Sequence, residues 1–391
     1  MSVALVLRGG LVWDGDSEQR RRADVVCDGA RITSVTAAGS VRPGEGDDVL
    51  DLDGATVLPG LLDGHVHLVW DGSRDPADVV ERDGEQLTVL RAVEHARAHL
   101  RQGVTTVVDL GSNWDVAITV ARGIDAGYVA GPRVLAAGRT VVMTGGHDPF
   151  WGNMCDGADA VVRGVREQVY AGAGLIKTAA TGGVYGRAVG EEVGASELSR
   201  DELTALATEA HRRGVKVAAH ALGEEGIRNA VLAGVDVIEH GVFLTEDIVA
   251  AMRERGTVLC PTLAVYRSIA GGAAPGYAVE KAAEVVRAHQ RGLRMALDAG
   301  VPVVAGTDAG SPGMPHPSLR RELACLREAG LAPVDVLRAA TSRAADAFGI
   351  DAGRVRVGAP ADLLVVDGDP LADPLLATTP RCVVRGGAIV D

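Results

Sequence analysis

Residues 57–68 read VLPGLLDGHVHL, an apolar strand pattern that ends in two histidines, His65 and His67. Side chains two residues apart lie on the same face of a strand, so the two imidazoles point toward one place. Such a pair can hold a metal ion, although buried, hydrogen-bonded histidines are the alternative. With ten histidines in 391 residues, roughly one chain in four has such a pair by chance. The position favours a metal site, because barrel enzymes place their active sites at the carboxyl ends of strands.

Seven further apolar runs resemble buried strands. They cover residues 104–110, 133–137, 175–179, 216–220, 237–240, 258–261 and 303–307. Helical patterns lie between most of them, among them 279–297 and 199–213, where Ser199 and Glu202 form a capping-box signature. Strands that alternate with helices predict an α/β fold with a parallel sheet. Eight such units predict a (β/α)8 TIM barrel over residues 58–355, although a doubly wound open sheet gives a similar pattern.

The two chain ends share a different pattern. Residues 4–58 and 361–387 contain short runs rich in β-branched residues, and Gly-Gly or Asp-Gly pairs separate these runs. Such pairs are typical of the tight turns in β-hairpins. We therefore expect residues 1–57 and 356–391 to form one small composite β-sandwich, with the barrel inserted between its two halves.

The composition limits the class of protein and its partners. Apolar residues make up 47% of the chain, enough for a large core, and only 3% are aromatic. The net charge of −13 argues against a nucleic acid or an anionic membrane as partner. No run reaches the ~20 apolar residues of a membrane span, and five dispersed cysteines suit a reducing cytoplasm. We expect a cytoplasmic protein that acts on a small molecule and forms a homo-oligomer, since self-association is common for this fold and size.

Lys177 lies inside the apolar run 175–179, an unusual place for a charged side chain. The ordinary explanation is a lysine that reaches solvent or pairs with an acid. Burial, however, disfavours the ammonium form of a lysine, and a neutral amine can add carbon dioxide to become a carbamate. A carbamate has two anionic oxygens, so a carboxylated Lys177 would be able to bridge two cations.

His220, His240 and Asp308 also lie at the ends of predicted strands. Each alone has a structural explanation, because a histidine can belong to the core and Asp308 can cap the turn that follows it. Together with the His-x-His pair and the lysine, however, they occupy the carboxyl ends of the strands in chain order. Because those ends meet at one mouth of a barrel, we predict a metal site there.

Four loop residues are candidates for substrate contact. His147 lies in TGGHDPFW after the third strand, and His316 lies in the loop after the eighth; both are expected to steady a substrate oxygen or carboxylate. Arg187 is a weaker candidate for a carboxylate. Tyr266, with the aromatic pair at 150–151, suggests an apolar or aromatic substrate group. Each also has the plain explanation of a surface or packing residue.

These residues resemble the pattern of the amidohydrolase superfamily. The nearest branch holds prolidase-like and other dipeptidases, fungal-toxin and phenylurea amide hydrolases, and relatives of imidazolonepropionase. The resemblance covers nearly the whole chain, including the β-rich ends and all eight predicted strands. The ordered ligand set is specific for the superfamily, and TGGH at 144–147 with KTAATGG at 177–183 is typical of the branch.

The resemblance implies two divalent cations joined by a carbamate. One cation would be held by His65, His67 and Asp308, the other by His220 and His240, with Lys177 as the bridge. Zinc is the expected metal, although manganese, iron or cobalt also suit these ligands. A hydroxide between the cations would attack the amide carbonyl, while Asp308 takes the proton and passes it to the leaving amine.

The implied reaction is hydrolysis of an amide bond in a small molecule such as an N-acyl amino acid, a dipeptide or an aryl amide. Leu222 departs from the pattern, because prolidase-like relatives are expected to have a tyrosine two positions after His220. Three alternatives stay open: a cyclic-amide hydrolase of the hydantoinase or imidazolonepropionase type, a mononuclear deaminase, and a metal-free scaffold. Lys177 argues against the deaminase, and the complete set of ligands argues against the scaffold.

Overall fold

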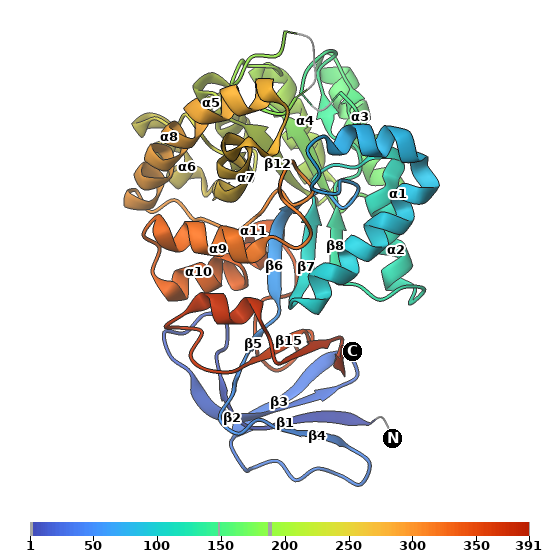
Figure 1. The fold of residues 1–391 in the computed structure, drawn as a ribbon, viewed down its shortest axis with the longest axis vertical. Helices are drawn as coiled ribbons and strands as arrows, with labels where there is room; N and C mark the ends of the chain where they lie inside the picture. The colour runs from blue at the N-terminus through green and yellow to red at the C-terminus, as the bar shows by residue number, and fades with distance from the viewer. Residues whose placement is uncertain (1–2, 148, 187–189, 391) are drawn as a thin grey trace.

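The computed structural model describes residues 3–147, 149–186 and 190–390. Figure 1 shows two parts arranged along its long axis. Strands from both chain ends form the smaller part, and the middle of the chain forms the larger part from strands and helices. Among the described residues, no helix is both long and apolar enough to cross a membrane.

Both chain ends contribute strands to one eight-stranded sheet. Its strands are β1 (Ala4–Val12), β2 (Arg21–Asp28), β3 (Arg31–Ala37), β4 (Asp48–Asp51), β5 (Thr56–Pro59), β15 (Leu363–Val366), β16 (Cys382–Arg385) and β17 (Ala388–Ile389). Their order is β17-β16-β15-β5-β1-β2-β3, and β4 also pairs with β1. The two ends join where β15 pairs antiparallel with β5. A buried apolar cluster with members from both ends, including Leu7, Val57 and Leu363, stabilises this sheet.

Parallel strands and helices alternate in the middle of the chain, as the predicted α/β class requires. The strands are β6 (Leu61–Val66), β7 (Val104–Asp109), β8 (Arg133–Ala136), β9 (Val141–Val142), β10 (Asn153–Met154), β11 (Leu175–Ala179), β12 (Lys216–Ala221), β13 (Val237–His240) and β14 (Val258–Cys260). The helices are α1 (Pro76–Arg101), α2 (Val116–Asp125), α3 (Ala158–Ala171), α4 (Arg200–Arg212), α5 (Glu224–Ala233), α6 (Glu246–Arg255), α7 (Leu263–Ser268), α8 (Gly276–Asp298), α9 (Leu319–Glu328), α10 (Pro333–Ala339) and α11 (Ser342–Phe348). Three short helical turns complete the chain, η1 (Asn113–Asp115), η2 (Ile269–Ala273) and η3 (Pro374–Thr378).

Helix α4 shows how local sequence sets an element. Ser199 Oγ accepts a hydrogen bond from Glu202 N at 3.3 Å, and the Glu202 carboxylate accepts one from Ser199 N at 2.8 Å. These two bonds satisfy amide groups that the first turn of a helix leaves without partners. The capping box predicted from the sequence is therefore present, and α4 begins at the next residue, Arg200.

The parallel strands form two sheets, one of β6-β7-β8 and one of β10-β9-β11-β12-β13-β14. Segment 302–309 lies between them and contacts both. Leu259 of β14 donates its N–H to Pro302 O at 2.9 Å, and Gly64 of β6 donates to Ala305 O at 2.9 Å. On the other side, Gly174 N, just before β11, donates to Ala136 O of β8 at 2.9 Å. The segment predicted as the eighth strand thus pairs on two sides without forming a regular strand.

The interior at one end of these strands is apolar. Leu62, Val108, Leu175 and Val237 are buried there together with Phe348 of α11. Buried polar side chains, among them His220, Glu239 and His240, lie toward the opposite, carboxyl ends of the same strands. That is where the predicted site residues lie.

Candidate active site

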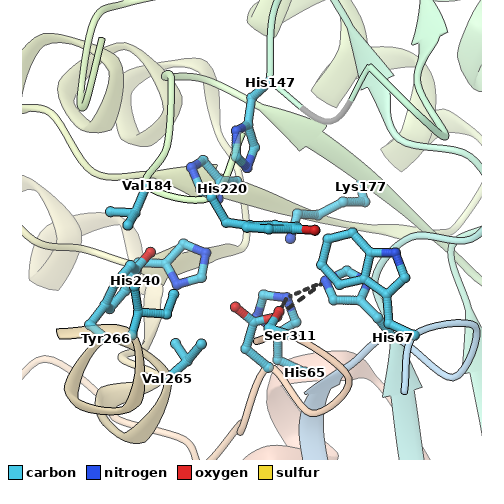
Figure 2. A pocket seen from close by; sticks show the side chains of 14 residues that line it. His65, His67, His147, Lys177, Val184, His220, His240, Val265, Tyr266 and Ser311 are labelled. Carbon is cyan, nitrogen blue, oxygen red and sulfur yellow. Dashed lines mark hydrogen bonds and ion pairs between the residues drawn. The ribbon is translucent and has the colours of Figure 1, made fainter. Parts of the chain in front are cut away.

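One pocket contains the six predicted metal ligands. The residues are His65, His67, Lys177, His220, His240 and Asp308, and all six line the same cavity. Figure 2 labels the first five of them. Its empty space is about 470 Å³, part of it open to solvent. Strands β6, β12 and β13 and the segment before Asp308 position the histidines and the aspartate at or next to their carboxyl ends, and Lys177 lies in the middle of β11. The structure therefore brings together residues that lie up to 243 positions apart in the sequence, His65 and Asp308 being the extremes.

Three of these side chains approach closely. His65 Nε2 and His67 Nε2 are 3.3 Å apart, and Asp308 Oδ1 lies 3.7 Å from the first and 3.3 Å from the second. Their donor atoms form a group that could hold a metal ion. Two imidazole nitrogens and a carboxylate oxygen are the ligand types that zinc prefers.

The backbone at this end is unusual at two predicted ligands. His240 has a φ of 73° and Asp308 has a φ of 57°, both in the left-handed region that non-glycine residues rarely adopt. Such a conformation costs about 1–3 kcal/mol and concentrates at functional sites. Here it occurs where each strand segment ends and the side chain faces the pocket.

Hydrogen bonds at Nδ1 orient three of the rings. His65 Nδ1 lies 2.9 Å from Glu239 Oε2, His67 Nδ1 lies 3.0 Å from Gly111 O, and His240 Nδ1 lies 2.7 Å from Thr262 Oγ1. The Gly111 carbonyl can only accept, so His67 carries a hydrogen on Nδ1 and turns Nε2 toward Asp308 and the pocket. Burial acts to lower the pKa of His67, but the hydrogen bond and charge of Asp308 outweigh it and raise that pKa. Fixing one ring nitrogen in this way prepares the other for a metal.

His220 and Lys177 are buried without the partners that such groups normally have. His220 Nε2 has no hydrogen-bond partner in the part of the chain that the structure describes. Lys177 is 2% exposed, and no ion pair joins it to a carboxylate of the described residues. A buried nitrogen base and a buried, unpaired amine are costly unless something else binds them. A cation and a carbamate satisfy both requirements, so the donor set fits a metal site.

The charges of the site suit metal binding as well. Burial, followed by the neighbouring cationic groups, holds the pKa of His65, His220 and His240 well below the ordinary histidine value. These rings are therefore neutral, which is the form that coordinates metals. Burial acts to raise the pKa of Asp308, but the hydrogen bond and charge of His67 outweigh it and leave that pKa below its ordinary value. Asp308 is therefore a carboxylate.

His147 lies in the same pocket and stacks on His220, with ring centroids 3.9 Å apart. Its Nδ1 lies 2.6 Å from Glu191 Oε1, and its backbone N–H donates to Glu197 Oε1 at 2.8 Å. Gly183 passes so close that an added Cβ would lie 2.3 Å from the His147 ring. The loop that follows β11 thus fixes His147 beside a predicted ligand.

The structure places the other predicted substrate residues differently. Tyr266 is buried in the pocket wall, and its ring lies 5.3 Å from that of His240. His316 lies outside the pocket lining, where its Nε2 donates to Trp70 O at 3.1 Å and its Nδ1 accepts from His99 Nε2 at 2.9 Å. Arg187 falls outside the described residues. The contacts predicted for these residues with a substrate stay predictions.

The remaining pocket wall is apolar and aromatic. Figure 2 shows Val184, Val265 and Tyr266 on one side, opposite His67. Trp70 also lines the pocket, and its ring contacts Trp151 at a centroid distance of 4.3 Å. The pocket can therefore hold an apolar group beside a strongly polar centre.

Several residues at the site were missed in the sequence. Glu239 and Thr262 hold ligand rings, Glu191 holds His147, and Ser311 donates to Asp308 Oδ1 at 2.8 Å. A charged residue inside the apolar run VIEH was the one signal that pointed to Glu239. The others lie in turns and loops, whose conformation has no periodic signal.

A pocket at the carboxyl ends of parallel strands, lined by histidines, a buried lysine and an aspartate, is typical of metal-dependent enzymes of the TIM-barrel type. Residues 56–390 match the model of the amidohydrolase family, and the chain belongs to that family. The family is generally metal-dependent, in keeping with this pocket.

Similar proteins narrow the chemistry. Ochratoxinase of Aspergillus niger is 28% identical over 425 residues, covering 98% of this chain and 86% of the relative. The crystal structure of a Xaa-Pro dipeptidase with methionine bound in its active site is 30% identical, with a TM-score of 0.90, and the match covers 99% of this chain and 100% of that one. A prolidase complexed with N-methylphosphonate-L-proline is 31% identical, with a TM-score of 0.91 and full coverage of both chains at 100%. The protein is accordingly a hydrolase that acts on carbon–nitrogen bonds of small molecules, on an α/β fold of TIM-barrel type.

Proposed function

We propose that this protein is a binuclear metal-dependent amidohydrolase that cleaves an amide bond of a small molecule. The observation on which this rests is the pocket of six donors, in which Lys177 is buried without a carboxylate partner. A single cation held by His65, His67 and Asp308 would not account for that lysine or for His220. A carboxylated Lys177 between two cations accounts for both.

The residues divide between the two proposed cations. His65, His67 and Asp308 would hold one and His220 and His240 the other, with the Lys177 carbamate shared between them. Zinc is the metal that this donor set suits best. When bound, the two cations would activate water and polarise the scissile carbonyl.

Asp308 is the proposed proton carrier. Its Oδ1 already accepts from Ser311 Oγ and lies 3.3 Å from His67 Nε2, so Oδ2 is the oxygen able to take a proton. We assign to Oδ2 the proton of the attacking water and its transfer to the leaving amine. His147, held by Glu191, would steady the carbonyl oxygen as negative charge develops on it.

The pocket walls favour an apolar or aromatic group on the substrate. Val184, Val265 and Tyr266 form one wall, and Trp70 lines the pocket beside His67. N-acyl amino acids, dipeptides and aryl amides are the substrate classes that we propose. Arg187 stays a candidate for a substrate carboxylate, whereas both ring nitrogens of His316, the other candidate, are used within the protein. Two similar proteins, an ochratoxinase and a Xaa-Pro dipeptidase, support this range.

The finer architecture is part of the same proposal. We infer a closed (β/α)8 barrel over residues 58–355, because segment 302–309 hydrogen-bonds to both β14 and β6. We infer a composite β-sandwich from residues 1–57 and 356–391, whose strands share one sheet. A homo-oligomer in the cytoplasm is the state that we propose for the working enzyme.

The test is hydrolysis of a substrate panel by the purified full-length protein. We expect turnover of at least one N-acyl amino acid, dipeptide or anilide, loss of that activity on chelation, and its recovery on addition of zinc, manganese or cobalt. Release of ammonia from an aminated ring, without turnover of any amide, would contradict the proposal and favour a deaminase. Turnover confined to hydantoin-like rings would favour the cyclic-amide alternative.

A further inference from the structure

Glu239 lies directly behind the predicted ligand His65. Its Oε2 is 2.9 Å from His65 Nδ1, and both side chains are buried, at 0% and 1% exposure. On the far side of the same ring, Nε2 lies 3.3 Å from His67 Nε2. Glu239 is therefore in contact with one nitrogen of a ring whose other nitrogen faces the pocket.

This carboxylate differs from the partners of the other two oriented rings. His67 is held by the carbonyl of Gly111, and His240 is held by the hydroxyl of Thr262. Both of those partners are neutral groups, whereas an ionised Glu239 places a full negative charge next to its ring. A carboxylate acceptor makes an imidazole a stronger metal ligand than a neutral acceptor does.

Packing alone does not explain Glu239. Among the described residues its second oxygen, Oε1, accepts no hydrogen bond from an N–H or O–H group, and the Cys260 thiol, a weak donor, is the neighbour of this carboxylate. Glu322 shows how a buried structural glutamate is normally satisfied, since its two oxygens accept from the backbone N–H groups of Leu263 and Ala264 at 2.9 and 2.8 Å. A buried carboxylate with so weakly bound an oxygen is costly, and the cost is reduced when positive charge lies nearby.

We propose that Glu239 is a positioning residue of the metal centre, one that holds His65 with its hydrogen on Nδ1 and its Nε2 lone pair directed at the cation. The inference rests on the proposed metal-dependent function. Glu239 also adds negative charge beneath the site. Two divalent cations that face one carboxylate and one carbamate leave a positive excess, and Glu239 reduces it.

The test compares the metal affinity of the full-length protein with that of Glu239→Gln. Competition with a chromogenic chelator measures the dissociation constant for zinc, and urea unfolding of the metal-free proteins measures stability. We expect zinc affinity to fall about 10–100-fold in Glu239→Gln, the range found for partners of metal ligands. We expect the metal-free variant to unfold at the same urea concentration or a higher one, because a neutral amide replaces a buried carboxylate. If Glu239 had a merely structural role, the variant would keep its zinc affinity and would unfold at a lower urea concentration.

Two further variants sharpen the test. Glu322→Gln makes the same substitution at a carboxylate of equal burial with backbone partners, and its zinc affinity should stay within about twofold of wild type. Glu239→Asp keeps the charge, so it should recover part of the affinity lost in Glu239→Gln. The aspartate variant also provides the test if Glu239→Gln does not fold.

Three results would overturn the inference. Equal zinc affinity in Glu239→Gln and wild type removes the positioning role and leaves the proposed function intact. Equal losses in Glu239→Gln and Glu322→Gln mean that any buried glutamate has this effect. A wild-type protein that binds no zinc, manganese or cobalt contradicts the metal-dependent function itself, and the role of Glu239 with it.

Discussion

Two histidine clusters, one buried and one partly buried, lie close together among the described residues, and only one resembles a metal site. The first, the pocket cluster, consists of His65, His67, His220 and His240. The second, the α1 cluster, consists of His95 and His99 of α1 with His316 of the loop before α9. Both clusters contact the segment that follows β6, because His67 belongs to it and His95 Nδ1 donates to Leu68 O at 2.8 Å.

The clusters differ in what their ring nitrogens contact. In the α1 cluster, His316 uses both nitrogens within the protein, with His99 and with the Trp70 carbonyl, and His95 stacks on it at 4.3 Å. No carboxylate of the described residues pairs with these rings. In the pocket cluster, Nε2 atoms converge on one another and on Asp308. The number of histidines is therefore uninformative, and the direction of their lone pairs toward a carboxylate distinguishes a ligand set from a packing cluster.

The largest contrast is expected when a histidine is replaced by glutamine in each cluster, at His220 in the pocket cluster and at His316 in the α1 cluster. His220→Gln should remove one of the two proposed cations and lower kcat/KM by about 10³-fold or more, because a metal supplies several kcal/mol of transition-state stabilisation. Elemental analysis and steady-state kinetics on an amide substrate measure both effects. A variant with full metal content and near-normal turnover would remove His220 from the pocket cluster's proposed role.

Asp308 is the carboxylate that the α1 cluster lacks. Asp308→Asn keeps the shape of the side chain and abolishes its ability to accept a proton, so we expect kcat to fall about 10²–10⁴-fold. The bound metal should change less than kcat, since an amide oxygen can still coordinate. Steady-state kinetics together with metal analysis separates a loss of proton transfer from a loss of bound metal. Retained activity in the metal-loaded variant would contradict the proton-carrying role.

The α1 cluster should make the free energy of unfolding depend on pH. Burial, followed by the charge of His95, lowers the pKa of His99 from 6.5 to about 3. The folded protein keeps His99 neutral, while the unfolded chain binds a proton below pH 6.5, so stability is lost as the pH falls toward 3. The loss amounts to about 1.4 kcal/mol per pH unit.

The measurement is urea unfolding of metal-free wild type and His99→Gln at pH 7 and pH 5. Because the variant cannot titrate at this position, the wild-type advantage in unfolding free energy should shrink by about 2 kcal/mol between the two pH values. A difference that does not change with pH would show that His99 is not held neutral by burial.

The smallest effect on the site is expected from His316→Gln. It removes contacts with His99 and the Trp70 carbonyl, so the free energy of unfolding should fall by about 1–3 kcal/mol. Metal content should equal that of wild type. A tenfold rise in KM would instead support the substrate contact that the sequence predicts for His316. Loss of metal would show that His316 contributes to the metal site.

Much of the fold could be predicted from the sequence because it depends on local patterns. The capping box at Ser199 and the alternation of apolar runs with helices both correspond to observed elements. The eighth predicted strand, 303–307, was less regular than its pattern suggested. A Cβ added to Gly306 would lie 2.9 Å from His65, and Asp308 has a left-handed φ. This segment therefore pairs with its neighbours through isolated β-bridges and not through a continuous ladder. Nonlocal packing of this kind has no signature in a single sequence.

The pocket cluster was readable for a different reason. Each of its members ends a strand, and the carboxyl ends of barrel strands meet, so chain order was enough to bring them together. Glu239 was missed because adjacent residues on a strand normally face opposite ways, which placed it away from His240 and gave no reason to place it near His65. Glu191 was missed because its contact with His147 depends on loop geometry.

The most direct test of the proposed function is metal content per chain in wild type and Lys177→Ala, both purified without chelator. The account predicts about two divalent cations in wild type and one or none in the variant, because the alanine cannot form the bridging carbamate. One cation in both proteins would contradict the binuclear centre and leave the mononuclear deaminase as the better explanation of the pocket.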